Sequence, residues 1–181
     1  MRDNFNQVMV HIFDVEGGYV DHPRDPGGAT NMGITIGTLR RWRDAPVTKE
    51  DVKNLTKMEA KQIYSAFYWD VVDCDYWPKG LDLVVMDACV NSGPRPAVKW
   101  LQRALGVDDD GRIGPITKGA VRATEHDGRR IGNAGEDPSG LIEDCIEERL
   151  KSVRSFRNYD VFGRGWENRI RKVRREALGM L

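Results

Sequence analysis

Residues 14–35, "DVEGGYVDHPRDPGGATNMGIT", are rich in glycine and proline and directly follow an apolar segment. Within residues 4–16, apolar side chains recur at the i, i+3, i+4, i+7 spacing of a helix that buries one face, namely Phe5, Val8, Met9 and Ile12. Two glycines follow Glu16, and glycine readily adopts the backbone angles that end a helix. The sequence therefore predicts a helix that ends at an acidic residue, beside irregular backbone.

Helical periodicity dominates the rest of the chain, and alternating strand patterns are scarce. Further helices are predicted from Thr56 through Phe67, at "LDLVVMDACVNSG" (81–93), at "PAVKWLQRALG" (96–106), and near 115–125, 140–157 and 165–178. Glu59, three residues after Thr56, predicts a capping box at the start of the first of these helices. We expect a mainly α fold with at most a small β-hairpin or sheet near residues 17–36.

Composition indicates a folded chain without an obvious nucleic-acid partner. Of the 181 residues, 40% are hydrophobic, which argues against disorder. Residues 1–90 carry 10 Lys and Arg against 14 Asp and Glu, whereas residues 91–181 carry 18 against 14, and this excess is too small to indicate nucleic-acid binding. The three cysteines, Cys74, Cys89 and Cys145, lack the spacing of a zinc or redox motif, so we interpret them as reduced thiols in the core.

The position of Glu16 on the first helix distinguishes it from the neighbouring acid. At 100° per residue, Glu16 lies about 20° from Phe5 around the helix, whereas Asp14 lies about 180° away. The negative helix end and burial both disfavour a charged carboxylate at Glu16. A carboxylic acid that stays protonated near neutral pH can act as the general acid of glycoside cleavage. The alternative is that "EGG" is only a helix stop.

A second acid and a hydroxyl follow in the same stretch. Asp25 and Thr30 are close enough in sequence for a loop or small hairpin to bring them opposite Glu16. Two carboxyl groups facing each other, with a hydroxyl that holds water, form a plausible hydrolytic site. The alternative is that Asp25, followed by Pro26 and two glycines, only builds a turn.

The motif "EGGYVDHPRDPGGATNMGIT" resembles the signature of glycoside hydrolase family 108, which includes peptidoglycan-cleaving phage endolysins and related lysozyme-like proteins. The segments "IYSAFYWDVVDCDYWPKGL", "VVMDACVNSG" and "WLQRALGVDDDGRIGPIT" also match the family pattern. This resemblance implies a lysozyme-like fold with Glu16 as the catalytic glutamate. Glu16, Asp25 and Thr30 are also similar to the Glu, Asp and Thr triad of phage-type lysozymes, although Asn31 occupies the position that matches that threonine.

The resemblance further implies a catalytic region over residues 1–93 and a helical peptidoglycan-binding region over residues 94–181, packed into one globule. Sugar polymers bind to aromatic ring faces and to amides that recognise N-acetyl groups. The candidate substrate contacts are the rings of Tyr19, Tyr68 and Trp69 and the amide of Asn91. The alternatives are that the rings belong to the core and that Asn91 caps a helix.

No metal or organic cofactor is expected. When the glycine of "DDDGRIG" is placed at the glycine position of an EF-hand loop, Gly106 and Thr117 fall at the first and last ligand positions. Neither residue supplies the carboxylate that calcium needs there, so the pattern predicts a solvated turn instead of a calcium site. His11, His22 and His126 lack a shared ligand spacing, which gives no support to a zinc site.

Together these patterns predict a monomeric muramidase that cleaves the β-1,4 bond between N-acetylmuramic acid and N-acetylglucosamine. A lytic transglycosylase, and a non-catalytic wall-binding or secretion-assisting protein, are the alternatives. The segment "MRDNFNQVMVHIF" does not have the pattern of a signal peptide, and no membrane-spanning run is evident, so we expect synthesis in the host cytoplasm and action on the wall after release. The basic segment 164–175 predicts transient contact with an anionic envelope, unless it is an ordinary solvated helix face.

Overall fold

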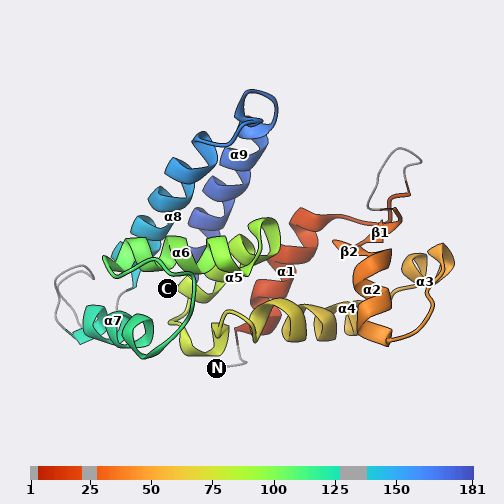
Figure 1. The fold of residues 1–181 in the computed structure, drawn as a ribbon, viewed down its shortest axis with the longest axis horizontal. Helices are drawn as coiled ribbons and strands as arrows, with labels where there is room; N and C mark the ends of the chain where they lie inside the picture. Colours follow the sequence, from red (N-terminus) through yellow and green to blue (C-terminus); the bar gives the residue numbers. More distant parts are fainter. Residues whose placement is uncertain (1–3, 22–27, 127–137) are drawn as a thin grey trace. The chain divides into compact units, whose positions relative to one another are not determined.

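The computed structural model describes residues 4–21, 28–126 and 138–181, with side chains up to residue 123 in the second range. The described chain is mainly helical, which confirms the predicted fold class (Figure 1). The elements are α1 (Phe5–Glu16), β1 (Thr30–Asn31), β2 (Ile34–Thr35), α2 (Ile36–Arg43), α3 (Lys49–Lys53), α4 (Lys57–Tyr64), the π-helical turn η1 (Ser65–Trp69), the 3₁₀ turn η2 (Cys74–Tyr76), α5 (Leu81–Ser92), α6 (Pro94–Leu105), α7 (Pro115–His126), α8 (Ser139–Arg154) and α9 (Tyr159–Leu178). Within the described ranges, no helix is both long enough and apolar enough to cross a membrane.

The chain forms two compact units, one of Phe5–Phe67 and one of Met1–Asn4 with Tyr68–Leu181. The division falls inside the π-helical turn. The boundary expected at residues 93/94 separates a catalytic region from a binding region, and the division into compact units does not test it. It stays a prediction.

The unit Phe5–Phe67 combines short helices with the predicted small sheet. In α1, the buried side chains include Val8, Met9 and Ile12, which confirms the expected apolar face. The two strands pair antiparallel, with Thr30 opposite Thr35. The sheet starts at the bridge between Val20 and Thr30, whose backbone amides and carbonyls exchange two hydrogen bonds of 2.8 Å.

The two helices that the sequence did not predict, α2 and α3, are short and well capped. Thr35 accepts a hydrogen bond from the Thr38 amide at the start of α2. Thr48 and Asp51 form a complete capping box at the start of α3. The capping box expected at α4 is wrong in its second half: Thr56 accepts from the Glu59 amide, but the Glu59 carboxylate binds Arg43 instead.

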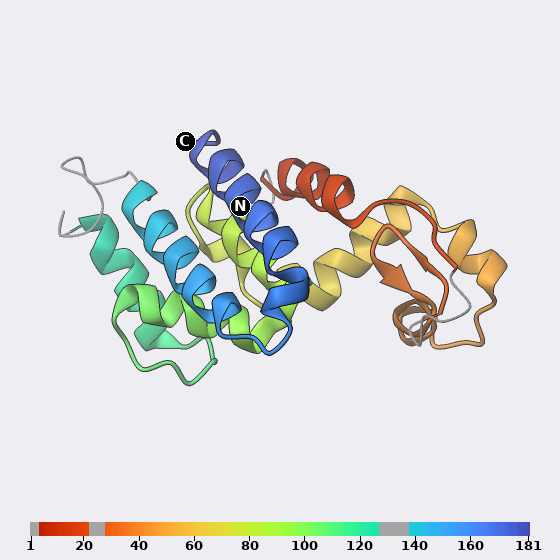
Figure 2. The ribbon, with the colours of Figure 1, turned by 90° about the horizontal axis from the view of Figure 1, so that it is seen from above.

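The unit that contains Tyr68–Leu181 is built around α5. Residues 81–89 of this helix are all buried, as expected of an apolar central helix. Helices α6, α8 and α9 pack on it, and Figure 2 shows α8 and α9 running side by side. The three cysteines are free and buried, which confirms their interpretation as core thiols, and burial raises the pKa of Cys89 to about 12.

A charged network lies inside this helical unit. Arg149 of α8 is 1% exposed and donates to Asp87 of α5 at 2.6 Å and to the Asn91 side-chain oxygen at 3.1 Å. Arg169 of α9 donates to the other oxygen of Asp87 at 2.9 Å. The network therefore joins three helices through one buried carboxylate.

The basic face of α9 is more neutral than the sequence suggested. Arg171 pairs with Glu167, Arg174 with Glu143, and Arg169 with the buried carboxylate of α5. The pairings with Glu143 and Asp87 join α9 to α8 and α5, which are distant in sequence, so the composition of segment 164–175 does not reveal them. Transient contact with an anionic envelope stays a prediction, with fewer unpaired charges to support it.

Candidate active site

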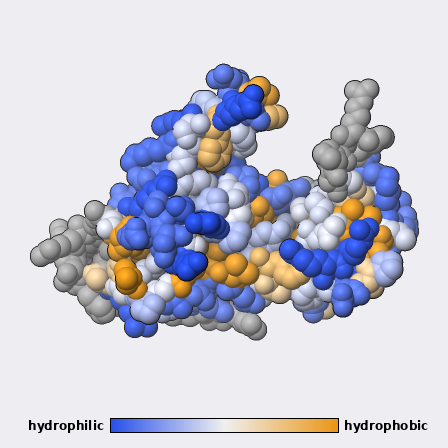
Figure 3. Space-filling model, viewed as in Figure 1, coloured by the Kyte–Doolittle hydropathy of each residue, from blue (hydrophilic) through white to orange (hydrophobic). Residues whose placement is uncertain are grey.

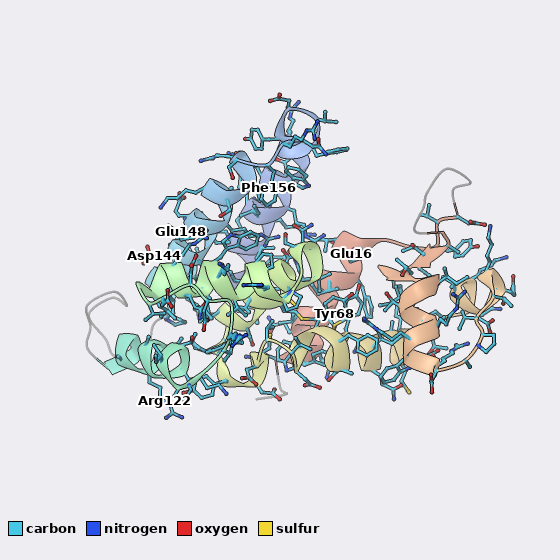
Figure 4. All side chains as sticks on the ribbon, in the orientation of Figure 1. Glu16, Tyr68, Arg122, Asp144, Glu148 and Phe156 are labelled. Atoms are coloured by element: carbon cyan, nitrogen blue, oxygen red, sulfur yellow. The ribbon has the colours of Figure 1, made fainter. Side chains whose placement is uncertain are left out.

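Glu16 is the last residue of α1 (Figure 4). Its side chain is half-buried, whereas Asp14 is exposed. The helical wheel thus placed both acids correctly. The helix ends here because Gly17 has a φ of +74°, in the left-handed region that suits glycine. The carboxyl group is therefore carried at the negative end of a twelve-residue helix.

The β1–β2 turn lies directly against the Glu16 side chain. Both turn residues, Met32 and Gly33, have positive φ values, of 50° and 75°, as a tight two-residue hairpin turn requires. A methyl group added at Gly33 would lie 3.0 Å from both Cβ and Cγ of Glu16. Only glycine at this position allows so close an approach between the turn and the acid.

Tyr64 of α4 holds the same turn from the other side. Its hydroxyl donates a hydrogen bond of 2.9 Å to the Met32 carbonyl, and its side chain is 1% exposed. Its ring packs edge-on against Phe13, one turn before Glu16 on α1. The end of α1, the hairpin turn and α4 are thus fixed to one another around the base of the Glu16 side chain.

Thr30 and Asn31 are neighbours in β1, and their side chains point to opposite faces of the strand. Asn31 is 8% exposed, and its amide donates to the carbonyls of Val52 and Lys53 at 3.0 and 3.1 Å, which ties the strand to the end of α3. Successive strand residues point to opposite faces, so Thr30 lies on the face away from α3. Its hydroxyl lies 3.5 Å from the Gly28 carbonyl, at the limit of a hydrogen bond. The amide of Asn31 is occupied by the fold, which leaves Thr30 as the better candidate for holding water.

The remaining site predictions fall in three places. Tyr19 is 37% exposed and precedes the residue that bridges to Thr30, so it belongs to the same local structure. Asp25 lies outside the described residues. Tyr68, Trp69 and Asn91 belong to the other compact unit.

Within that second unit, the core alternative describes Trp69, whereas Asn91 does not cap its helix, whose C-cap is Gly93. Trp69 is 1% exposed, and its ring nitrogen donates to Asp75 at 3.1 Å, so the ring lies in the core. Asn91 lies at the end of α5, and its side-chain oxygen accepts from the buried Arg149. Tyr68 is half-buried in the π-helical turn, a structure that occurs frequently at functional sites.

The residues that sequence reasoning missed are Gly33 and Tyr64. The Gly33 signal was present, because asparagine and glycine, which stand at positions 31 and 33, are typical turn residues. Tyr64 gave no local signal, since its partner is 32 positions away. Among the described residues, no group of three or more His, Cys, Asp or Glu side chains could hold a metal ion.

Comparisons with known proteins identify the family of this chain. The family model described as glycosyl hydrolase 108 matches residues 9–93, which include Glu16 and the rest of α1 from residue 9, the hairpin and α5. The solved structure of SagA from Brucella abortus is 42% identical, covers 99% of this chain and 97% of its own, and superimposes with a TM-score of 0.81. A comparison with curated proteins gave no match. The glutamate at the end of α1, the family model that covers it and the similarity over nearly the whole chain together show that this protein belongs to the glycosyl hydrolase 108 family.

Proposed function

We propose that the protein cleaves the glycan strand of peptidoglycan, at the β-1,4 bond between N-acetylmuramic acid and N-acetylglucosamine. The observation that carries the proposal is the fixed position of Glu16, which ends α1 and is braced by the glycine turn and by Tyr64. A general acid must be held in place before the substrate binds, because small displacements greatly reduce catalysis. The family supplies the reaction class, the cleavage of glycosidic bonds.

In this mechanism Glu16 protonates the glycosidic oxygen as the bond to the sugar breaks. Thr30, on the β1 face away from α3, holds the attacking water, and Asp25 activates or positions it. Tyr19, which is 37% exposed, is the candidate ring for stacking on a sugar. The reaction requires proton transfer and water alone, so the mechanism uses no cofactor.

The test is the pair of variants Glu16→Gln and Asp14→Asn. Glutamine keeps the size of the side chain but has no acidic proton, so cleavage of purified peptidoglycan should fall by a factor on the order of 10² to 10⁴. Asp14→Asn changes an exposed acid two residues away and should retain most of the activity. Circular dichroism and melting temperature show whether both variants remain folded. A folded Glu16→Gln variant that clears peptidoglycan at the wild-type rate would show that Glu16 is not the general acid.

Mass spectrometry of the released fragments identifies the reaction. Hydrated reducing ends on muramic acid indicate hydrolysis at the proposed bond. Anhydromuramic ends would indicate a transglycosylase, in which the 6-hydroxyl of the sugar replaces water. The absence of any glycan fragments from the wild-type protein would indicate a binding role instead.

A further inference from the structure

The helical unit of Tyr68–Leu181 contains an open pocket of about 450 Å³. One side is formed by the start of α6 and the other by the "DDDGRIG" loop between α6 and α7. The lining includes Val71, Arg95, Val98, Asp110, Arg112 and Ile113. In Figure 3, strongly hydrophilic and hydrophobic side chains lie next to each other in this region of the molecule. The pocket therefore combines charge with apolar walls.

The loop side of the pocket is held in place by a buried glutamine. Gln102 of α6 is 2% exposed, and its amide nitrogen donates to the Asp110 carboxylate at 2.8 Å and to the Arg112 carbonyl at 3.0 Å. Its oxygen accepts from the Gly111 amide at 2.8 Å. The sequence predicted a solvated turn here, within the region that the family resemblance assigns to wall binding. The structure instead shows a loop tied to α6 through one side chain, which gives the pocket a fixed wall before any ligand binds.

The close approach of Gly111 to Arg95 completes this wall. Gly111 has a φ of +75°, and a methyl group added there would lie 2.7 Å from Cγ of Arg95. The loop backbone therefore packs directly on the aliphatic part of Arg95, which holds that side chain beside the pocket. Any larger residue at position 111 would push the two sides of the pocket apart.

Two guanidinium groups in the pocket have no bonded counter-charge. In the part of the chain that the structure describes, neither Arg95 nor Arg112 makes a side-chain hydrogen bond or an ion pair. The nearby carboxylate of Asp110 already accepts from the Gln102 amide and from the Arg112 backbone amide, both at 2.8 Å. These hydrogen bonds lower the pKa of Asp110 and keep it ionised. The two arginines and this carboxylate give the lining a net charge of +1.

We propose that this pocket binds a carboxylate of the short acidic peptides that substitute the glycan of peptidoglycan. Guanidinium groups bind carboxylates through paired, charge-assisted hydrogen bonds. The walls formed by Val71, Val98 and Ile113 contact the small alkyl side chains next to that carboxylate. A polyanion fits less well, because Asp110 repels additional negative charge. The choice of peptide rests on the function proposed above, whereas the preference for a carboxylate rests on the pocket alone.

The binding test uses the full chain and the tetrapeptide L-alanyl-γ-D-glutamyl-meso-diaminopimelyl-D-alanine. Isothermal titration should show binding that weakens by about tenfold or more in Arg112→Gln and in Arg95→Gln, since each loses a charged hydrogen bond. The same peptide with its carboxylates amidated should bind equally weakly to all variants. Arg122→Gln is the matched control, because Arg122 is exposed on α7 and stacks on Tyr76 outside the pocket (Figure 4). Equal affinity of all proteins for the peptide, or equal affinity of the wild type for acetate and for the peptide, would overturn the proposal.

A second assay separates this proposal from the proposed function. Arg112→Gln should raise KM on peptide-bearing glycan and leave kcat/KM unchanged on glycan strands from which an amidase has removed the peptides. If the wild type binds the tetrapeptide through the arginines but cleaves no glycan, the pocket stands and the enzymatic proposal fails. If the wild type cleaves both glycans equally and binds no tetrapeptide, the pocket proposal fails and the enzymatic one stands.

Discussion

Replacing Gly33 by alanine is expected to disable the enzyme while leaving Glu16 itself unchanged. The added methyl group would lie 2.3 Å from the Tyr64 hydroxyl oxygen and 3.0 Å from two carbons of Glu16. Ordinary van der Waals contact begins near 3.4 Å, so the turn, the tyrosine or the glutamate has to move by about 1 Å. The substitution therefore tests whether the hairpin turn positions the acid.

Two effects contribute to the expected loss of stability. An alanine in the left-handed region costs roughly 1–2 kcal/mol. Displacing Tyr64 from the Met32 carbonyl forfeits a hydrogen bond worth about 0.5–1.5 kcal/mol. We expect the free energy of unfolding to fall by about 2–3 kcal/mol. A displacement of about 1 Å at the acid lowers kcat/KM by a factor on the order of 10².

Urea unfolding and turnover of purified peptidoglycan measure the two effects separately. Gly17→Ala is the control for backbone strain, because Gly17 has nearly the same φ (+74°) and nothing within 4 Å of an added methyl group. It should lose only the strain part of the stability. Combining Gly33→Ala with Tyr64→Phe removes the closest clash, so the double variant should be more stable than the sum of the single losses predicts. Activity of Gly33→Ala within twofold of wild type, together with a stability loss no larger than that of Gly17→Ala, would refute the reasoning.

Three further predictions concern the helical unit. Asp87→Ala leaves the buried Arg149 without its counter-charge, so the free energy of unfolding in urea should fall by about 3–5 kcal/mol, and a loss below about 1 kcal/mol would contradict the buried pairing. Hydrogen bonds from Arg154 and a neighbouring tyrosine lower the pKa of Glu167 from 4.5 to about 2, so its charge contributes stability that is present above pH 4.5 and lost as the pH falls toward 2. The melting-temperature difference between wild type and Glu167→Gln should therefore shrink over that pH range, and a constant difference would rule out this contribution. The buried thiols, including Cys89 with its pKa raised to about 12, should react with a thiol reagent at pH 8 only after unfolding, and rapid labelling of the native protein would contradict their burial.

Sequence periodicity predicted the long helices because each of them buries an apolar face. Helix α9 begins at Tyr159, earlier than the expected residue 165, although its first turns contain Gly163 and Gly165, which disfavour a helix. Helix α3 has only five residues, too few for a periodic pattern, and it depends on its capping box and on the amide of Asn31. Short elements of this kind are specified by contacts that a local pattern does not contain.

The candidate site also contains residues that local sequence features predict and residues that depend on distant contacts. Glu16 was predictable because its place on the helix and the glycines after it are local features. The brace formed by Gly33 and Tyr64 joins segments that only the fold brings together, so the turn signal at Gly33 did not reveal its contact with Glu16, and Tyr64 had no local signal. Asn91 was predicted as a substrate contact, and its side-chain oxygen meets Arg149, which lies 58 positions further along the chain. A local sequence pattern could not predict this hydrogen bond.

The buried carboxylate of α5 has a consequence for how the helices assemble. Residues 81–89 of α5 are all buried, so no solvent-facing side fixes the rotation of this helix about its own axis. Burial of apolar surface is non-directional and changes little when such a helix turns among its neighbours. Asp87 removes that freedom, because only one rotation directs its carboxylate at Arg149 of α8 and Arg169 of α9. Every other rotation would leave a charged group in the core without its partner. The network adds little net free energy of folding, yet it selects a single arrangement from several packings that hydrophobic contacts alone would leave nearly equal in energy.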